Sequence, residues 1–223
     1  AQQMTDVGTP REQTLVVDML NARVGNPTNM NMYQQGVTIN HGYHQMAGAL
    51  LYDIDTAKGT QIPDLAAEMP VPNADFTVFT VKLREGLTWS DGQPFSADDV
   101  IFTDGMIRNT PALAYSAAYG AQIASMTKVD DHTVEVTTTK PTPRLAIVLG
   151  SVIYGNPFHV VPKHVWEGQD AATFPNFPPV TISAYKYKDH DPNGTWFLWE
   201  KREDWQNSDV GQMIGEPKPQ YVL

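Results

Sequence analysis

The sequence predicts a mixed α+β fold in which antiparallel hairpins outnumber β-α-β units. Two observations predict the hairpins: residues 76–83 alternate between apolar and polar, and residues 126–139 form two strand-like segments around a turn. A third observation, apolar residues at helical spacing after residue 96, predicts a helix between them. The 223 residues, 41% of them hydrophobic and 18% charged, are enough to bury a sizeable core.

The first expected elements are a strand and a short helix. Residues 14–20 form an apolar, β-branched run with the length of a buried strand. The Asn-rich residues 23–31 predict a loop. Within residues 42–51, four apolar residues share a helical spacing and predict one apolar face: Tyr43, Met46, Ala47 and Leu50.

The middle of the chain carries the clearest local signals. The strand expected at 76–83 is followed by Asp91-Gly92, a strong turn signal. Ser96 and Asp99 fit a capping box, so a helix should begin at Ala97. Four large residues around this turn and helix are expected in the core: Trp89, Phe95, Val100 and Phe102.

The last part of the chain predicts a short helix and a second hairpin. Residues 145–149 are apolar and suit a short helix. Several prolines then mark a loop-rich segment. Residues 180–188 and 196–201 alternate like strands on either side of a turn at 189–194.

Composition excludes several classes of function. With 15 Lys and Arg against 25 Asp and Glu, the net charge of −10 argues against nucleic acid or an anionic membrane as a partner. No apolar run has the length of a membrane-spanning helix. The absence of cysteine excludes disulfides, thiolate metal sites and a cysteine nucleophile.

The N-terminal residues Ala1-Gln2-Gln3 are typical of a chain from which a signal peptide has been removed. We therefore expect an exported, periplasmic protein. Because no cysteine is present to carry a lipid, we do not expect a lipoprotein.

Four blocks in order along the chain resemble the N-terminal portion of the family 5 extracellular solute-binding proteins. Members of that family bind oligopeptides, dipeptides, nickel or oligosaccharides for ABC importers. The longest block runs from Phe79 to Val100 and contains Leu83-Arg84-Glu85-Gly86 and Trp89-Ser90-Asp91-Gly92-Gln93-Pro94-Phe95. The others lie at residues 129–136, 161–164 and 184–205.

This resemblance implies the first lobe of a periplasmic-binding-protein type II fold, a mixed sheet with an inserted hairpin-rich subdomain. Residues 1–50 and 180–223 would form the core part of that lobe, and residues 51–179 the inserted subdomain. The second lobe of the family is expected to be absent from this chain. A binder of this kind is not an enzyme, needs no cofactor or catalytic residue, and delivers its solute to an ABC permease in the membrane.

By family position, solute contacts are expected from loops at the edge of a cleft. The candidate contact residues are Asn29, Asn31, Tyr33, Gln35, Thr38, His44, Tyr115, Asn156, Ser183 and Tyr185. Tyr33 can stack on a sugar face or a peptide side chain, and the Asn amides can bond hydroxyls or amides. The alternatives are that these Asn residues supply turn geometry and that His44 is structural. At Ile182-Ser183 the chain lacks the glycine that often lets a ligand approach closely in the family.

Residues 189–200 match the calcium-loop pattern D-x-[DN]-x-[DN]-G-x5-E, with Asp189, Asp191, Asn193 and Glu200 as candidate ligands. That loop needs helices on both sides, whereas the flanks here alternate like strands. Pro192 also constrains the backbone within it. We therefore prefer a solvated hairpin turn and expect no metal.

The preferred function is the binding of an oligosaccharide in a cleft between two lobes, because the Asn- and Tyr-containing loop and the opening residues resemble cello-oligosaccharide binders. An oligopeptide is the alternative solute. Two further hypotheses are a carbohydrate hydrolase and a calcium-stabilised interaction module. No spacing of Asp and Glu residues indicates the hydrolase.

Overall fold

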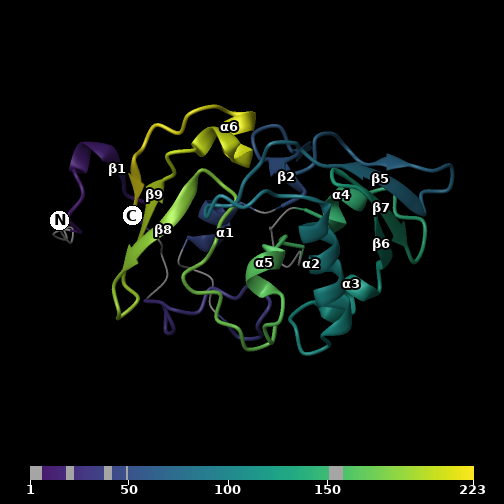
Figure 1. Ribbon diagram of the computed structural model, residues 1–223, viewed down its shortest axis with the longest axis horizontal. Coiled ribbons are helices and arrows are strands. Elements are labelled where there is room, and N and C mark those ends of the chain that lie inside the picture. The colour runs from purple at the N-terminus through teal and green to yellow at the C-terminus, as the bar shows by residue number, and fades with distance from the viewer. Residues whose placement is uncertain (1–6, 19–22, 38–41, 49, 151–157) are drawn as a thin grey trace.

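The chain is described here by a computed structural model, which covers residues 7–18, 23–37, 42–48, 50–150 and 158–223. Its strands form two four-stranded sheets and one hairpin, which lie along the longest axis with a four-stranded sheet toward each end (Figure 1). The first sheet has the order β1 (Thr14–Leu15), β10 (Tyr221–Val222), β9 (Phe197–Lys201) and β8 (Tyr185–His190). In this sheet β1 is parallel to β10, and the other pairs are antiparallel.

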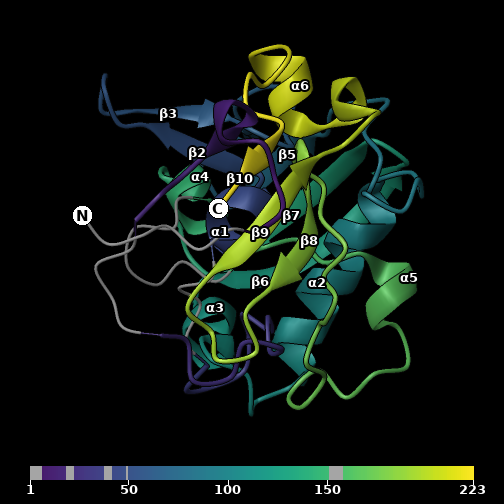
Figure 2. The ribbon, with the colours of Figure 1, turned by 90° about the vertical axis from the view of Figure 1, so that its left-hand side faces the viewer.

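The second four-stranded sheet is antiparallel throughout. Its order is β4 (Val71–Pro72), β5 (Val78–Lys82), β7 (Thr133–Thr138) and β6 (Ile123–Asp130). The separate hairpin consists of β2 (Tyr52–Asp55) and β3 (Thr60–Pro63). In the view along the long axis, β8 and β9 lie in front of β6 and β7 (Figure 2). The predicted strand at 76–83 and the predicted hairpin at 126–139 are thus confirmed, and the structure shows that they pair in one sheet.

The helices are short except for α2. They are α1 (Tyr43–Ala47), α2 (Ala97–Asn109), α3 (Ser116–Gly120), α4 (Leu145–Val148), α5 (Lys163–Trp166) and α6 (Asp209–Met213), with 3-10 turns at Arg11–Gln13 and Trp205–Asn207. The predicted capping box starts α2: the Ser96 hydroxyl accepts from the Asp98 N–H (3.2 Å), and the Asp99 carboxylate accepts from the Ser96 N–H (3.1 Å). None of the described helices has the length and apolar character that a membrane crossing requires.

Three expected boundaries are wrong for identifiable reasons. Of the strand expected at 14–20, the described residues 14–18 form a strand only at Thr14–Leu15, an edge strand beside β10, and Leu15 and Val17 are 48% and 51% exposed; residues 19–20 lie outside the described residues. The helix expected at 42–51 ends at Ala47, because Gly48 leaves the helical conformation with φ of 66°.

The strand expected to start at residue 180 starts at Tyr185. The residues before it bond to other segments instead of to a neighbouring strand. The Thr181 carbonyl accepts from the Ser90 N–H (2.7 Å), and the N–H groups of Ile182 and Ser183 both donate to the Ala47 carbonyl (3.1 Å each). Those bonds fasten α1 to the residues that precede β8.

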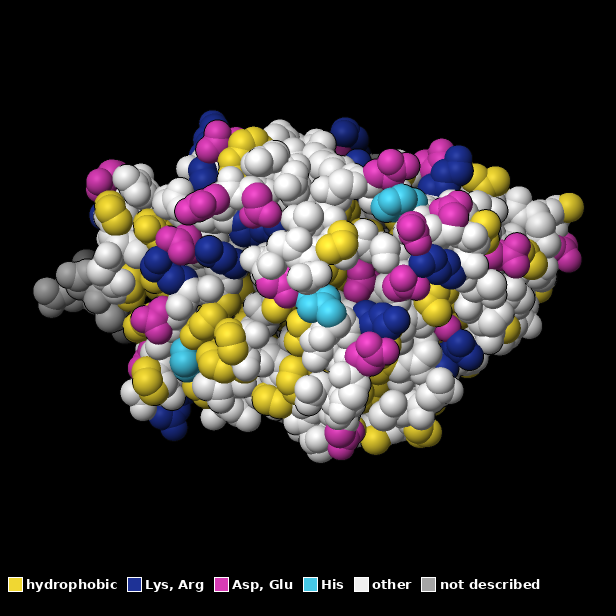
Figure 3. Space-filling view, viewed as in Figure 1, with side chains coloured by type: hydrophobic (Ala, Val, Ile, Leu, Met, Phe, Trp, Pro, Cys, Tyr) yellow, Lys and Arg dark blue, Asp and Glu magenta, His cyan; other side chains and the backbone are white. Residues whose placement is uncertain are grey.

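Acidic and basic side chains are interspersed across the face shown in Figure 3, and apolar side chains appear there in small groups. The net charge of −10 is therefore not gathered into one acidic patch on this face. Interspersed charges produce no strong field of one sign that would steer a highly charged partner to this face.

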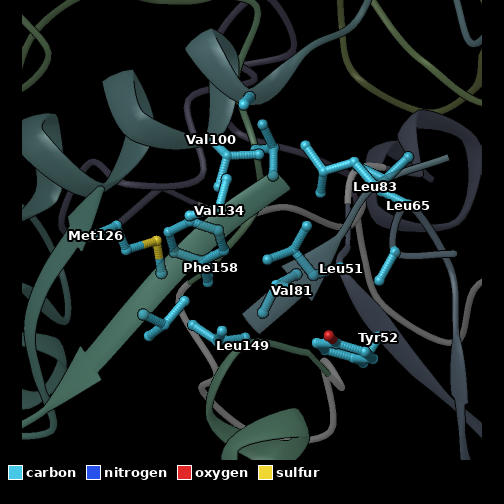
Figure 4. Close-up of a cluster of buried hydrophobic side chains, with 14 of the residues drawn as sticks. Leu51, Tyr52, Leu65, Val81, Leu83, Val100, Met126, Val134, Leu149 and Phe158 are labelled. Carbon is cyan, nitrogen blue, oxygen red and sulfur yellow. The ribbon is translucent and has the colours of Figure 1, made fainter. Parts of the chain in front are cut away.

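Two hydrophobic clusters form the core. The larger one joins α2, the β4–β5–β7–β6 sheet and the hairpin, and Figure 4 shows its centre around Val81, Val134 and Phe158. Trp89, Phe95 and Val100 lie in it as predicted, whereas Phe102 is only partly buried at its edge. The smaller cluster packs α1 against β8 and β9: Val24, Met30, Tyr43, Ala47, Ala184, Tyr185, Phe197, Trp199 and Val222.

Arg202, directly after β9, connects the first sheet to the larger cluster, which contains Trp89 and Ile182. Its side chain is buried and donates to the carbonyls of Thr88 (2.9 Å), Trp89 (3.2 Å), Ile182 (3.3 Å) and Ser183 (3.4 Å). It also bonds both carboxylate oxygens of Asp204, at 3.0 and 2.7 Å. A buried guanidinium is tolerated where its donors are paired in this way.

Replacement of Arg202 by Ala should lower the free energy of unfolding by about 3–5 kcal/mol, because it leaves buried carbonyls without a donor. Urea denaturation measures the loss. The control is Lys188→Ala, which removes an ion pair to Glu200 (2.9 Å) on the surface of the β8–β9 hairpin and should lower it by less than about 1 kcal/mol. Equal losses in the two variants would contradict the central position given to Arg202.

Candidate functional site

The predicted contact residues that the structure brings together lie around α1. Gly42 and Gly48, with φ of 75° and 66°, bound this helix, and glycine adopts such angles without strain. His44 lies on α1 itself, and Ser183 is fastened to its C-terminal end. Together with three further residues that contact this region, they form what we call the α1 site: Tyr33, His44, His159, Ser183 and Asp209.

The loop before α1 is held by its own asparagines. The Asn31 amide accepts from the N–H groups of Tyr33 (2.8 Å) and Gln34 (3.1 Å). It donates to the carbonyls of Ala171 (2.9 Å) and Phe174 (2.7 Å). Turn geometry, the alternative considered for these residues, therefore accounts for Asn31.

Asn29 is bonded in a similar way. Its amide donates to the Gln34 side chain (2.7 Å) and accepts from the Asn31 N–H (3.1 Å). Solute contact by Asn29 or Asn31 stays a prediction, and it would require these internal bonds to be exchanged.

Tyr33 is enclosed, with 2% of its surface exposed. Its hydroxyl donates to the His159 carbonyl and accepts from the His159 N–H (3.0 Å). Its ring meets Trp166 edge to face at a centroid distance of 6.3 Å. Burial raises the pKa of Tyr33 well above its ordinary value. A ring packed in this way presents no free face for stacking, so the predicted stacking of Tyr33 on a solute would require it to become exposed.

His44 and His159 face each other inside the site. Their ring centroids are 5.1 Å apart, and the rings are nearly perpendicular, at 73°. All four ring nitrogens are buried and have no hydrogen-bond partner of normal geometry among the described residues.

Both imidazoles are neutral near pH 7. Burial lowers the pKa of His44 to about 4. Burial together with the nearby His44 lowers the pKa of His159 to about 3, and the Gly48 backbone opposes this shift only weakly.

Asp209 is the buried acid of the site, with 1% of its surface exposed. Its carboxylate accepts from the Val210 N–H (2.5 Å) and from the Ser183 hydroxyl. Burial raises the pKa of Asp209. It also raises that of the nearby Asp64 well above the ordinary value, and the charge of Asp209 adds to this effect.

Gly48 leaves the space that Asp209 occupies. A Cβ at position 48 would overlap an Asp209 carboxylate oxygen and lie 3.0 Å from the Ser183 Cβ. The chain has no glycine at 182–183. The close packing of Ser183 and Asp209 against the end of α1 depends instead on the glycine at position 48.

The remaining predicted residues lie elsewhere. Gln35 and Tyr115 are at the surface, where the Gln35 amide donates to the Ala112 carbonyl (3.2 Å) and Tyr115 has a positive φ of 72°. The Tyr185 hydroxyl donates to the Pro219 carbonyl (2.8 Å) at the first sheet. Thr38 and Asn156 lie outside the described residues. Solute contact by all of these residues stays a prediction.

Sequence reasoning missed Asp209, and it included His159 only as the last residue of a contact segment expected at 155–159. Ser208 caps α6 by accepting from the Gly211 N–H (3.0 Å), and such a cap signal explains an acid in the first helical turn without any burial. The burial of Asp209 follows from the approach of Gly48 and Ser183, which are distant in sequence.

The calcium-like sequence forms the hairpin turn that we preferred, between β8 and β9. Asp191 accepts from the Thr195 hydroxyl (2.5 Å), and Glu200 pairs with Lys188 (2.9 Å) across the hairpin. In the described ranges, no group of three or more His, Asp or Glu side chains is arranged to hold a metal ion.

Comparison with known proteins identifies relatives over most of the chain. The family model of the bacterial extracellular solute-binding proteins, family 5, matches residues 60–222. The peptidoglycan-binding protein YepA of Agrobacterium fabrum is 28% identical over 173 residues, which are 75% of this chain and 27% of the relative.

Two solved structures share the fold. A periplasmic oligopeptide-binding protein of Thermotoga maritima with bound mannohexaose has a TM-score of 0.72 at 21% identity, over 96% of this chain and 38% of that one. The oligopeptide-binding protein AppA of Bacillus subtilis, in complex with a nonapeptide, has a TM-score of 0.72 at 19% identity, over 94% and 39%. The chain spans about a quarter of the length of the curated relatives it matches. The expected type II fold of the family is thereby confirmed for this stretch of chain.

Gly48→Ala should be far more damaging than the same change at Gly59, which has the same φ of 66° and no neighbouring atom within 4 Å of the point where a Cβ would lie. The strain of a positive φ alone should lower the free energy of unfolding by about 1 kcal/mol in Gly59→Ala. The contact with the anchored Asp209 carboxylate should bring the loss in Gly48→Ala to about 3 kcal/mol. Thermal or urea denaturation compares the two, and similar losses would show that the close contact at Gly48 is unimportant.

His44→Leu should flatten the dependence of stability on pH. The unfolded chain takes up a proton on His44 near pH 6.5, whereas the folded chain does so only near pH 4, so stability is full above pH 6.5 and is lost as the pH falls toward 4. Between pH 6 and 4.5, the free energy of unfolding should therefore fall less steeply in His44→Leu than in the unmodified protein. The difference between the two slopes should be about 1.4 kcal/mol per pH unit.

Urea denaturation at a series of pH values provides the comparison. The opposite contribution of the buried carboxyls Asp64 and Asp209, whose raised pKa values favour the folded state at lower pH, is common to both proteins and cancels in their difference. Gly59→Ala serves as a destabilised control whose curve should run parallel to that of the unmodified protein. A curve for His44→Leu that is also parallel would contradict the prediction.

Proposed function

The chain belongs to the bacterial extracellular solute-binding proteins of family 5, and from this premise we propose that it binds an oligosaccharide for an ABC importer. An oligopeptide is the alternative solute. The family match over residues 60–222 is the observation that carries the proposal. The fold is shared with a Thermotoga maritima protein that holds mannohexaose and, at the same TM-score of 0.72, with a Bacillus subtilis protein that holds a nonapeptide, so the preference for a sugar rests on the sequence resemblance.

The solute would be enclosed between this lobe and a second one that closes on it by a hinge motion. Polar side chains in such a cleft fix the orientation of the solute, and the apolar surface excludes water. An ABC permease would then receive the solute, so the protein would act outside the cytoplasmic membrane, as exported members of the family do.

The disposition of carboxyl groups favours binding over hydrolysis. A glycoside hydrolase needs two carboxyl groups that flank the substrate. Two acids that interact electrostatically, Asp64 and Asp209, are 7% and 1% exposed and are enclosed by the fold. We therefore propose that the solute is bound and released without chemical change.

A thermal-shift measurement on the protein as its gene encodes it tests the proposal, with mannohexaose and a nonapeptide as the two probes. Ligand at 100 times its Kd should stabilise the folded state by about 2.7 kcal/mol and raise Tm accordingly. Chromatography of the recovered sugar should show it intact. A shift with the nonapeptide alone would overturn the sugar preference, and cleavage of the sugar would overturn the binding role. No shift with either probe would overturn the proposed solute classes.

A further inference from the structure

Buried polar atoms without partners gather around the α1 site. Besides the four nitrogens of His44 and His159, they include the Trp166 indole nitrogen and the Asn176 amide oxygen. Trp166 contacts the Tyr33 ring, and the Asn176 amide donates to the hydroxyl of Tyr43, the residue next to His44 (3.1 Å). Of these atoms, the four imidazole nitrogens lie together, because the His44 and His159 ring centroids are 5.1 Å apart.

Such a concentration needs an explanation, because an unpaired buried donor or acceptor costs about 1–3 kcal/mol. Native proteins satisfy almost all of these groups with protein, ordered water or ligand. A protein evolved only to fold would replace unpaired imidazoles in a packed interior by apolar side chains. The pair is therefore best explained by a group that it binds.

The hydrogen-bonding capacity of the two imidazoles defines that group. Each neutral imidazole offers one donor and one acceptor. Donors and acceptors are therefore equal in number. A carboxylate would satisfy only the donors and an ammonium group only the acceptors, whereas a hydroxyl group donates and accepts at one oxygen atom.

We propose that His44 and His159 form a subsite for a hydroxyl group, filled by water in the solute-free protein and by a sugar hydroxyl in the complex. The second half of this assignment rests on the proposed function. The ring nitrogens are closed to solvent, so the solute gains access only when the hydrogen bonds from Ile182 and Ser183 that fasten α1 open. Gly42 and Gly48 bound α1, and glycine changes its backbone angles more easily than other residues do when a helix moves.

Calorimetric titration with mannohexaose of the protein as its gene encodes it tests the subsite through three variants. His44→Leu removes a donor and an acceptor and should raise Kd about tenfold, which corresponds to one lost hydrogen bond. His44→Gln keeps both kinds of group and should remain within about threefold of the unmodified protein. His132→Leu is the matched control, since His132 also has an unpartnered ring nitrogen but lies in the β6–β7 turn, and it should leave Kd unchanged.

The ring nitrogens of the two histidines, observed by NMR in 15N-labelled protein, distinguish water from sugar. The first half of the proposal, water in the solute-free protein, is supported if the 15N chemical shifts are typical of hydrogen-bonded nitrogen. Chemical shifts typical of nitrogen without a hydrogen bond overturn this water half. A further change on addition of mannohexaose supports the sugar half.

Mannohexaose could bind without changing the chemical shifts of the ring nitrogens, and His44→Leu could bind it with the Kd of the unmodified protein. In that case the sugar half is wrong while the proposed function stands. If neither mannohexaose nor the nonapeptide binds the unmodified protein, the proposed function and the sugar half fail together, and the water half is decided by the solute-free spectrum. A nonapeptide that alone perturbs the ring nitrogens would replace the sugar hydroxyl by a peptide group as occupant and overturn the assignment.

Discussion

The buried guanidinium of Arg202 is the interaction on which the arrangement of the lobe depends. A charge removed from water must be paired, and here Asp204 and the carbonyls of residues 88–89 and 182–183 supply the pairing. These acceptors belong to segments about 100 residues apart, so one side chain fixes the position of the larger core relative to the first sheet. Since the N–H groups at 182–183 bond the end of α1, Arg202 also positions that helix indirectly.

Around α1, most polar groups are satisfied within the chain. The asparagines of the preceding loop hold its turns, the Tyr33 hydroxyl bonds both backbone groups of His159, and Asp209 fills the space that Gly48 leaves open. The exceptions in this region among the described residues are the imidazole pair, the Trp166 indole nitrogen and the Asn176 amide oxygen. A site whose side chains are held by internal hydrogen bonds, and which leaves a few polar groups unpaired, is suited to recognition. The fold rather than the ligand then orders the side chains around the ligand.

Local signals predicted local structure well. Ser96 and Asp99 form the capping box, the alternation at 76–83 becomes β5, and the turn expected at 189–194 closes the β8–β9 hairpin at residues 191–196. Each depends on bonds between residues close in sequence. The strand predicted from residue 14 onward was wrong at residues 16–18, because an apolar run does not reveal whether its strand lies at a sheet edge. The structural role of Asn31 could not be predicted in the same way. Its amide donates to the carbonyls of residues 171 and 174, which are distant in the chain, and the sequence does not show that these groups meet.

The sequence alone determined the class of fold, the order of its elements and the family, since periodicity, turn chemistry and ordered motifs all lie within short stretches of chain. Only the tertiary structure decided which polar residues hold the fold together and which are left unpaired. Burial and hydrogen bonding at Arg202, Asp209 and the His44–His159 pair arise where segments distant in sequence meet. The free energy of a buried polar group depends on its partners in space, and a residue type carries no record of those partners.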